Sequence, residues 1–188
     1  RRVLSRDFFD RPTVVVAREL LGKFLVIRQE DGTEIASMIH ETEAYDGPKD
    51  AASHAFRGRT ERTKIMFGGA GFWYVYFIYG MYWMLNIVTG PESYPAAVLI
   101  RGVGPYNGPG KLTKALRINK YFHEQEARRE TGLWIEDRNK PLTSYIIKKT
   151  PRIGVDYAGP HWSKKLYRFV LKEKKIIKRT RSKEEDFS

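Results

Sequence analysis

The chain has 188 residues, of which 41% are hydrophobic and 13% aromatic, so it is long enough to bury the core of one domain and is not a disordered protein. It contains no cysteine, which excludes disulfides, cysteine-ligated zinc and a cysteine nucleophile. The formal net charge of +12 lies entirely in residues 95–188, with 22 basic and 10 acidic side chains, and suggests a polyanionic partner such as nucleic acid.

The first 50 residues predict one helix and one hairpin. Residues 12–22 begin with a proline and end at a glycine, which suits a helix. Apolar runs at 24–27 and 35–39 flank an Asp-Gly pair, a pattern typical of a β-hairpin. Residues 46–50 predict a loop because of their Gly and Pro content.

Residues 65–91 contain no charged side chain, and this length alone would suit a transmembrane helix. However, eight of the 17 residues from Phe72 to Val88 are aromatic, whereas membrane helices are mostly aliphatic. Gly80 also divides the run into two pieces that favour β-structure. We therefore expect two strands of a sheet here.

The second half predicts short elements. They are a strand at 96–100, a loop at 102–110, a helix at 111–118, a charged helix at 125–130, further strands at 133–135, 152–155 and 166–171, and a basic tail at 172–188. Strands outnumber helices and do not alternate with them regularly. The predicted class is α+β, a single domain over residues 1–188 with a curved, mostly antiparallel sheet and peripheral short helices.

Candidate catalytic groups stand at the end of the second hairpin strand. Glu41, Glu43 and Tyr45 share one face, because alternate residues of a strand point to the same side. One carboxylate could act as a general base beside a phenol that stacks on a ligand. The alternative is a solvated strand end with ordinary surface glutamates. The four histidines have no metal-ligand spacing, so we expect no metal site.

Aromatic and basic groups offer a possible nucleic-acid surface. Tyr74 and Tyr76 would share a face of one strand, where they either pack in the core or stack on an extruded base. Asn86, in an apolar run, either satisfies backbone groups or faces a ligand. The basic residues before this run are either solvated or hold phosphates. They are Arg57, Arg59, Arg62 and Lys64.

Nine motifs occur in an order and spacing that resemble one family. They include Glu41-Thr-Glu-Ala-Tyr45, Ala52-Ser-His54, Arg57-Gly-Arg-Thr60, Tyr74-Val-Tyr-Phe-Ile-Tyr-Gly-Met-Tyr82, Val98-Leu-Ile-Arg101, Gly108-Pro-Gly-Lys-Leu112 and Arg152-Ile-Gly-Val155. Together, from about residue 11 to residue 170, the chain resembles the alkyladenine (3-methyladenine) DNA glycosylase family. It departs from that family in a shorter segment before Gly108 and in Gly102, where alanine is usual.

The resemblance implies a monofunctional DNA glycosylase of base excision repair. Such an enzyme flips alkylated or deaminated purines out of duplex DNA and hydrolyses the N-glycosidic bond; its substrates include 3-methyladenine, 7-methylguanine, hypoxanthine and ethenoadenine. Glu43 would activate the water and Arg101 would help to place it. The implied base pocket is Tyr45, His54, Tyr76, Asn86 and Leu99. The implied intercalating residues are Tyr79 and Met81, and the implied backbone contacts are Arg57, Arg59, Arg62 and Lys111.

The resemblance implies no metal or organic cofactor, no membrane association, a monomer, and an intracellular location with the DNA, in the nucleoid or the nucleus. Two alternatives remain open from the residues alone. The first is a nucleic-acid-binding module without catalysis, and the second is a membrane-peripheral protein that uses the aromatic run and the basic tail. Base release from damaged duplex DNA distinguishes the glycosylase from a binding module, and liposome flotation at physiological salt tests the membrane alternative.

Overall fold

The computed structural model describes residues 1–174, which are arranged around one long strand, β3 (Glu34–Asp46). The first part of β3 pairs with β2 (Phe24–Arg28). Its second part lies between β6 (Ala96–Val103) and β10 (Arg168–Glu173). The strand order is β1-β8-β2-β3-β6-β5-β4, with β7, β9 and β10 attached at the sides, and the described pairs are antiparallel. The predicted α+β class with an antiparallel sheet is confirmed.

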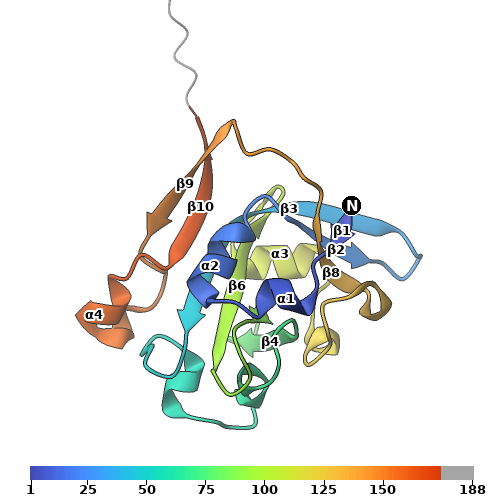
Figure 1. Ribbon diagram of the computed structural model, residues 1–188. Coiled ribbons are helices and arrows are strands. Elements are labelled where there is room, and N and C mark those ends of the chain that lie inside the picture. The colour runs from blue at the N-terminus through green and yellow to red at the C-terminus, as the bar shows by residue number, and fades with distance from the viewer. Residues whose placement is uncertain (175–188) are drawn as a thin grey trace, which may run out of the picture.

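The other elements are short. The strands are β1 (Arg2–Val3), β4 (Trp73–Ile78), β5 (Tyr82–Val88), β7 (Tyr106–Asn107), β8 (Leu133–Asp137) and β9 (Tyr145–Thr150), and the helices are α1 (Arg6–Phe9), α2 (Thr13–Glu19), α3 (Pro109–Ala115) and α4 (Gly159–Ser163). Figure 1 shows the β9–β10 hairpin and α4 at one side of the main sheet, across the molecule from the N-terminus. The apolar faces of α2 and α3 pack on the sheet, where Val16, Ala17 and Leu112 have no exposed surface.

The charge-free run forms the paired strands β4 and β5, as predicted. The turn between them has positive φ at both Tyr79 and Gly80, and Met81 N donates to Ile78 O at 3.1 Å, as in the tight turns that suit hairpins. Within residues 1–174, no helix combines the length and apolarity that crossing a bilayer requires. The turn leaves the Tyr79 side chain 84% exposed.

The prediction of a charged helix at 125–130 is wrong. Trp73 N donates to Gln125 O at 2.8 Å and Ala127 N donates to Gly71 O at 2.8 Å, so this segment covers the free edge of β4. Backbone groups of an edge strand need partners, and this need outweighs the weak helical preference of a short charged segment. Only a 3₁₀ turn at Arg129–Thr131 follows.

Four further segments differ from the prediction. Residues 152–155 form no strand, and the predicted loop at 102–110 instead contains the end of β6 and the paired strand β7. The pattern at 145–150 was not recognised as a strand, although it pairs with β10 as β9. Of the predicted basic tail, Lys172 and Glu173 belong to β10, and the part from residue 175 onward lies outside the described residues.

The two departures near Arg101 have local explanations. A Cβ on Gly102 would lie 2.2 Å from His40 Cε1, so the His40 imidazole would have to move to admit the alanine that is usual here. Gly108 N donates to Arg101 O at 2.9 Å, so the short segment closes as a hairpin onto β6. The short connection is therefore a folded feature, and α3 begins directly after it.

Candidate active site

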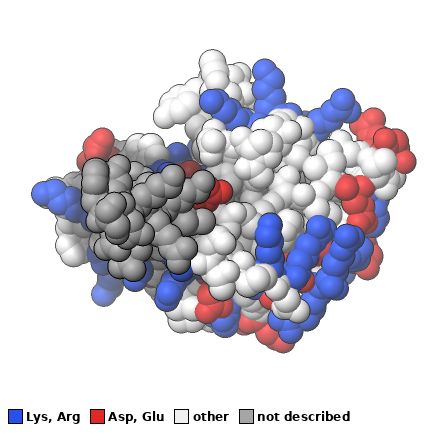
Figure 2. All heavy atoms as spheres, turned by 90° about the horizontal axis from the view of Figure 1, so that it is seen from above, with Lys and Arg blue, Asp and Glu red and all other residues white. Residues whose placement is uncertain are grey.

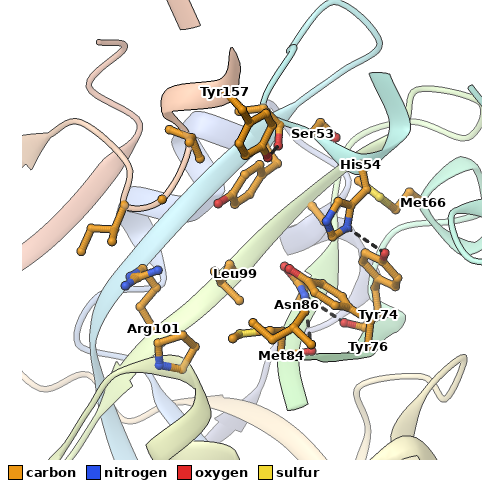
Figure 3. Close-up of a pocket in the computed structure, with 18 of the residues that line it drawn as sticks. Ser53, His54, Met66, Tyr74, Tyr76, Met84, Asn86, Leu99, Arg101 and Tyr157 are labelled. Atoms are coloured by element: carbon orange, nitrogen blue, oxygen red, sulfur yellow. Dashed lines mark hydrogen bonds between the residues drawn. The ribbon is translucent and has the colours of Figure 1, made fainter. Parts of the chain in front are cut away.

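A cavity of about 350 Å³ opens beside β3, β4, β5 and β6, a volume suited to a small organic ligand. It brings together seven of the site residues that the family resemblance implies, which come from segments up to 56 positions apart. They are Tyr45, His54, Tyr76, Tyr79, Asn86, Leu99 and Arg101. Figure 3 shows His54, Tyr74 and Tyr76 at one side of the cavity and Arg101 at the other, with Leu99 between them.

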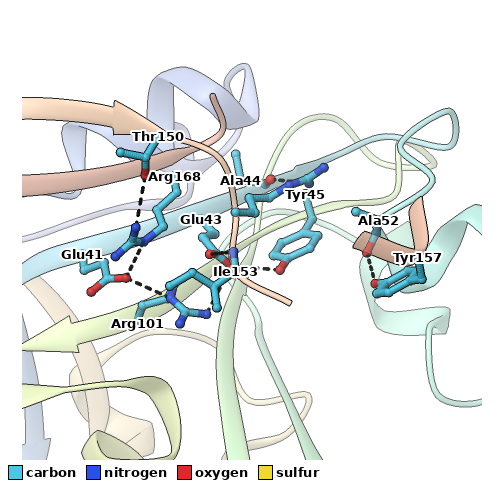
Figure 4. Close-up of polar contacts among 11 residues, drawn as sticks. Glu41, Glu43, Ala44, Tyr45, Ala52, Arg101, Thr150, Ile153, Tyr157 and Arg168 are labelled. Carbon is cyan, nitrogen blue, oxygen red and sulfur yellow. Dashed lines mark hydrogen bonds and ion pairs between the residues drawn. The ribbon is translucent and has the colours of Figure 1, made fainter. Parts of the chain in front are cut away.

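An irregularity in strand pairing aims Arg101 at both glutamates. The register between β3 and β6 shifts by one residue at Glu41 and returns at Thr42, which leaves Arg101 without a paired residue on β3. Such bulges redirect side chains and are common next to active sites. Arg101 Nε donates to Glu41 Oε1 at 3.0 Å, and Arg101 Nη1 donates to Glu43 Oε2 at 3.4 Å (Figure 4). The predicted shared face of the two glutamates is confirmed.

Glu43 is fully buried directly behind the cavity wall. Its Oε1 accepts from the backbone N of Ile153 at 2.8 Å, and its Oε2 accepts from the Tyr45 hydroxyl at 2.9 Å. Glu43 itself does not line the cavity, but Tyr45, Ile153 and Arg101 all do. Burial raises the pKa of Glu43 above its ordinary value, and the charge of Arg101 opposes this rise. A carboxylate in this setting is a stronger base than one in water.

The structure separates the roles of the two glutamates, which spacing alone left equivalent. Although burial alone would raise the pKa of Glu41, hydrogen bonds and positive charge from Arg168 and Arg101 lower it below its ordinary value. Arg168 Nε donates to Glu41 Oε1 at 2.7 Å. Glu41 is therefore held as a permanent anion in an ion-pair cluster, whereas Glu43 has the properties expected of a general base.

The wall of aromatic side chains opposite Arg101 is uncharged. His54 Nδ1 lies 3.1 Å from the Tyr74 hydroxyl, and the His54 and Tyr76 ring centroids are 4.7 Å apart. His54 keeps exposed surface at the cavity, but partial desolvation of its imidazole and the charge of Arg62 lower the pKa of His54 to about 4. His54 is thus neutral at pH 7, and a cationic ligand would meet no positive charge on this ring.

Asn86 both satisfies backbone groups and faces the cavity, the two alternatives that the sequence left open for it. Its Nδ2 donates to Tyr74 O at 3.1 Å and to Met84 O at 3.5 Å, so backbone groups fix the orientation of the amide. The side chain also lines the cavity, although the residue is only 3% exposed. A fixed, buried amide at the cavity wall can discriminate between ligands by shape and by hydrogen bonding.

A segment that sequence reasoning did not select forms another part of the wall. Tyr157 lines the cavity and donates from its hydroxyl to Ala52 O at 2.9 Å. The Arg152 guanidinium lies 4.8 Å from the centroid of the Tyr45 ring and forms a fully buried ion pair with Asp50. The motif at 152–155 was the available signal, but nothing local indicates that it meets residues more than 100 positions earlier.

The remaining candidate residues lie outside the cavity. Met81 is 62% exposed on the β4–β5 turn, beside Tyr79. The Arg62 guanidinium lies 4.8 Å from the Tyr76 ring centroid, next to the aromatic wall, and Arg57, Arg59 and Lys111 are exposed. On the described part of the surface seen in Figure 2, basic and acidic side chains are interspersed around a stretch of uncharged residues.

Comparison with known proteins matches residues 7–175 to the model of the methylpurine-DNA glycosylase family. A protein of Legionella pneumophila (strain Paris) is 45% identical over 187 residues, covering 95% of this chain and all of the relative. One of Ehrlichia chaffeensis is 42% identical and covers 90% of this chain and 93% of the relative. One of Methanocella arvoryzae is 46% identical and covers 84% and 86%. All three are provisionally named 3-methyladenine DNA glycosylases.

Proposed function

Because the chain belongs to the methylpurine-DNA glycosylase family, we propose that its cavity holds a damaged purine flipped out of duplex DNA and that Glu43 activates the water that releases the base. Membership makes the chain a DNA-3-methyladenine glycosylase, an N-glycosyl hydrolase of DNA repair. The observation that carries the proposal is the buried Glu43 carboxylate, hydrogen-bonded to three residues that line an aromatic cavity, Tyr45, Arg101 and Ile153.

The cavity suits a flat, electron-poor base. In the proposed complex, Tyr45 stacks on one face of the purine, and His54 and Tyr76 contact the other. An alkylated, cationic purine gains cation–π attraction from such rings, and the neutral state of His54 preserves it. The fixed amide of Asn86 would crowd the exocyclic amine of undamaged guanine, which rejects the normal base by a clash.

The chemical step uses the strand end where Glu43 and Arg101 meet. Ionised Glu43 takes a proton from water as the water oxygen attacks the anomeric carbon and the bond to the base breaks. The same negative charge stabilises the oxocarbenium-like transition state, and Arg101 holds the water. The Tyr45 hydroxyl donates to Glu43 Oε2 at 2.9 Å, whereas Glu43 Oε1 accepts from Ile153 N and keeps a second lone pair for the water.

The direct test is base release. We expect the protein to liberate free base from duplex oligonucleotides containing 3-methyladenine, 7-methylguanine, hypoxanthine or ethenoadenine, measured by chromatography of the released purine. Binding of the duplex without release of any modified purine would contradict the proposal and favour a module that only binds nucleic acid. We also propose that the enzyme acts as a monomer, inside the cell with the DNA.

Tyr79 is placed to fill the gap that a flipped nucleotide leaves. It lines the cavity edge, and its side chain is 84% exposed at the tip of the β4–β5 turn. Because stacking of a base on an aromatic side chain contributes about 1–3 kcal/mol, we expect Tyr79→Ala to weaken binding to a duplex with a stable abasic-site analogue by about 5- to 150-fold. Competition binding measures this loss.

Tyr121→Ala is the matched control, because Tyr121 is 67% exposed but does not line the cavity. Its affinity should stay near that of the native protein. Equal losses in both variants would show that Tyr79 contributes only general surface contact.

A further inference from the structure

Glu41 is buried beside the proposed catalytic pair, but the reaction described above does not use it. We propose that Glu41, held by Arg168, is a positioning residue that keeps the Arg101 guanidinium partly away from Glu43, so that Glu43 stays available as a base. This inference rests on the proposed function of Glu43 and Arg101.

The geometry carries the proposal. The segment of β3 that contains Glu41 is paired on one side with β6 and on the other with β10, and each neighbour supplies one arginine. Both arginines donate to the same atom, Glu41 Oε1, at 3.0 Å from Arg101 Nε and at 2.7 Å from Arg168 Nε. Arg168 Nη1 also donates to Thr150 Oγ1 at 3.2 Å, which ties the cluster to β9 (Figure 4).

Glu41 and Glu43 compete for the same guanidinium. Arg101 lies 3.0 Å from Glu41 but 3.4 Å from Glu43, so its closer contact is with the glutamate that takes no part in the chemistry. Because Arg101 stands at a bulge and has a long flexible side chain, strand pairing alone does not fix its guanidinium. Without the Glu41 charge, Arg101 would pair more closely with Glu43 and neutralise more of its negative charge.

The charges around Glu43 predict in which direction its pKa shifts when a neighbouring charge is removed. The groups that face Glu43 directly are Arg101 from β6, Tyr45 and Glu41 from β3, and the Ile153 N–H. Two further side chains, Arg152 and Tyr76, lie close enough to interact with the charge of Glu43. Glu41 raises the pKa of Glu43, and Arg101 lowers it. Removing the Glu41 charge therefore lowers that pKa. Removing Arg168 leaves Glu41 less neutralised and raises it.

The experiment compares Glu41→Gln and Arg168→Gln by single-turnover base release from a hypoxanthine duplex between pH 4 and 8. We expect the Glu41→Gln rate to fall by about 10-fold, a loss typical of residues that orient a catalytic group. Its acidic limb should move to lower pH, whereas that of Arg168→Gln should move to higher pH. Affinity for a duplex with a stable abasic-site analogue should stay within about 3-fold of native.

Glu136→Gln is the matched control. Glu136 is 1% exposed and also accepts from two arginines, Arg129 at 2.6 Å and Arg138 at 3.0 Å, but it does not line the cavity. The rate of base release by Glu136→Gln and the acidic limb of its pH profile should match those of the native protein. Circular dichroism verifies folding, and if Glu41→Gln fails to fold, the upward shift in Arg168→Gln alone decides.

Acidic limbs that coincide with the native one in both charge variants, or that move in the same direction in both, would overturn the proposal. Failure of the proposed function is a different result: the native protein would release no base, or Glu43→Gln would be fully active. An active native protein with an inactive Glu43→Gln variant and unshifted Glu41 and Arg168 variants would therefore reject only this inference.

Discussion

Replacing Glu43 by glutamine is expected to lower the rate of base release by about 10²–10⁴-fold, the usual contribution of a general base. Glutamine keeps the size of the side chain and can accept the hydrogen bond from Ile153 N, which lies 2.8 Å from Glu43 Oε1. It cannot take a proton from water or supply negative charge to the transition state. Single-turnover release from duplexes containing hypoxanthine or 3-methyladenine measures the effect.

The same substitution should leave both folding and DNA binding intact. The raised pKa of Glu43 means that the folded state holds this proton to a higher pH than the unfolded state, whose carboxyl has a pKa near 4.5. Stability attributable to this group therefore falls as the pH rises from that value through the folded pKa. At pH 7 the variant should be at least as stable as the native protein. Loss of activity accompanied by a lower melting temperature would point to a structural role instead.

Replacing Arg152 by methionine is expected to cost about 3–5 kcal/mol of unfolding free energy, because it leaves the Asp50 carboxylate buried without its partner. Neither side chain has exposed surface, and Arg152 Nη2 donates to Asp50 Oδ1 at 2.8 Å. Arg152 Nη1 also donates to Ala44 O at 2.8 Å. Urea unfolding at pH 7 measures the loss.

Arg11→Met provides the comparison, because the Arg11–Glu19 pair is 34% and 48% exposed and should contribute about 0–1 kcal/mol. Similar losses in both variants would show that burial of the Arg152–Asp50 pair has no special effect.

The Arg152–Asp50 pair also supports the site. Asp50 accepts from Asp46 N at 3.0 Å and from Ala52 N at 3.1 Å, so the pair joins the strand end, the loop before His54 and the segment of Ile153.

Local pattern was sufficient for the elements whose partners are adjacent in the chain. The pattern predicts the hairpin of β2 and β3 and the two strands β4 and β5, because each pair is closed by a short turn between runs that favour β-structure. The helix at 125–130 failed for the opposite reason: the free edge of β4, more than 50 residues away, takes its backbone hydrogen bonds. The helical preference of a short segment is small compared with the need of an edge strand for hydrogen-bond partners.

The candidate residues were largely identifiable from the sequence, since motif order named Glu43, Tyr45, His54 and Arg101 and strand alternation placed Glu41 and Glu43 on one face. Strand alternation alone did not distinguish the two glutamates, and the tertiary structure shows the different electrostatic setting of each. Alternation treats the two as equivalent, but the bulge at Arg101 and the pairing of β10 bring two arginines onto Glu41 and leave Glu43 buried with one.

The sequence by itself determined the fold class, the excess of positive charge and the ordered set of chemical groups, because composition, periodicity and motif order are local properties. Only the tertiary structure decided which of those groups meet and in what electrostatic setting. Ion pairing, burial and cavity walls such as Tyr157 depend on segments that lie more than 50 positions apart in the chain, and a pKa responds to those neighbours rather than to the residues beside it in sequence.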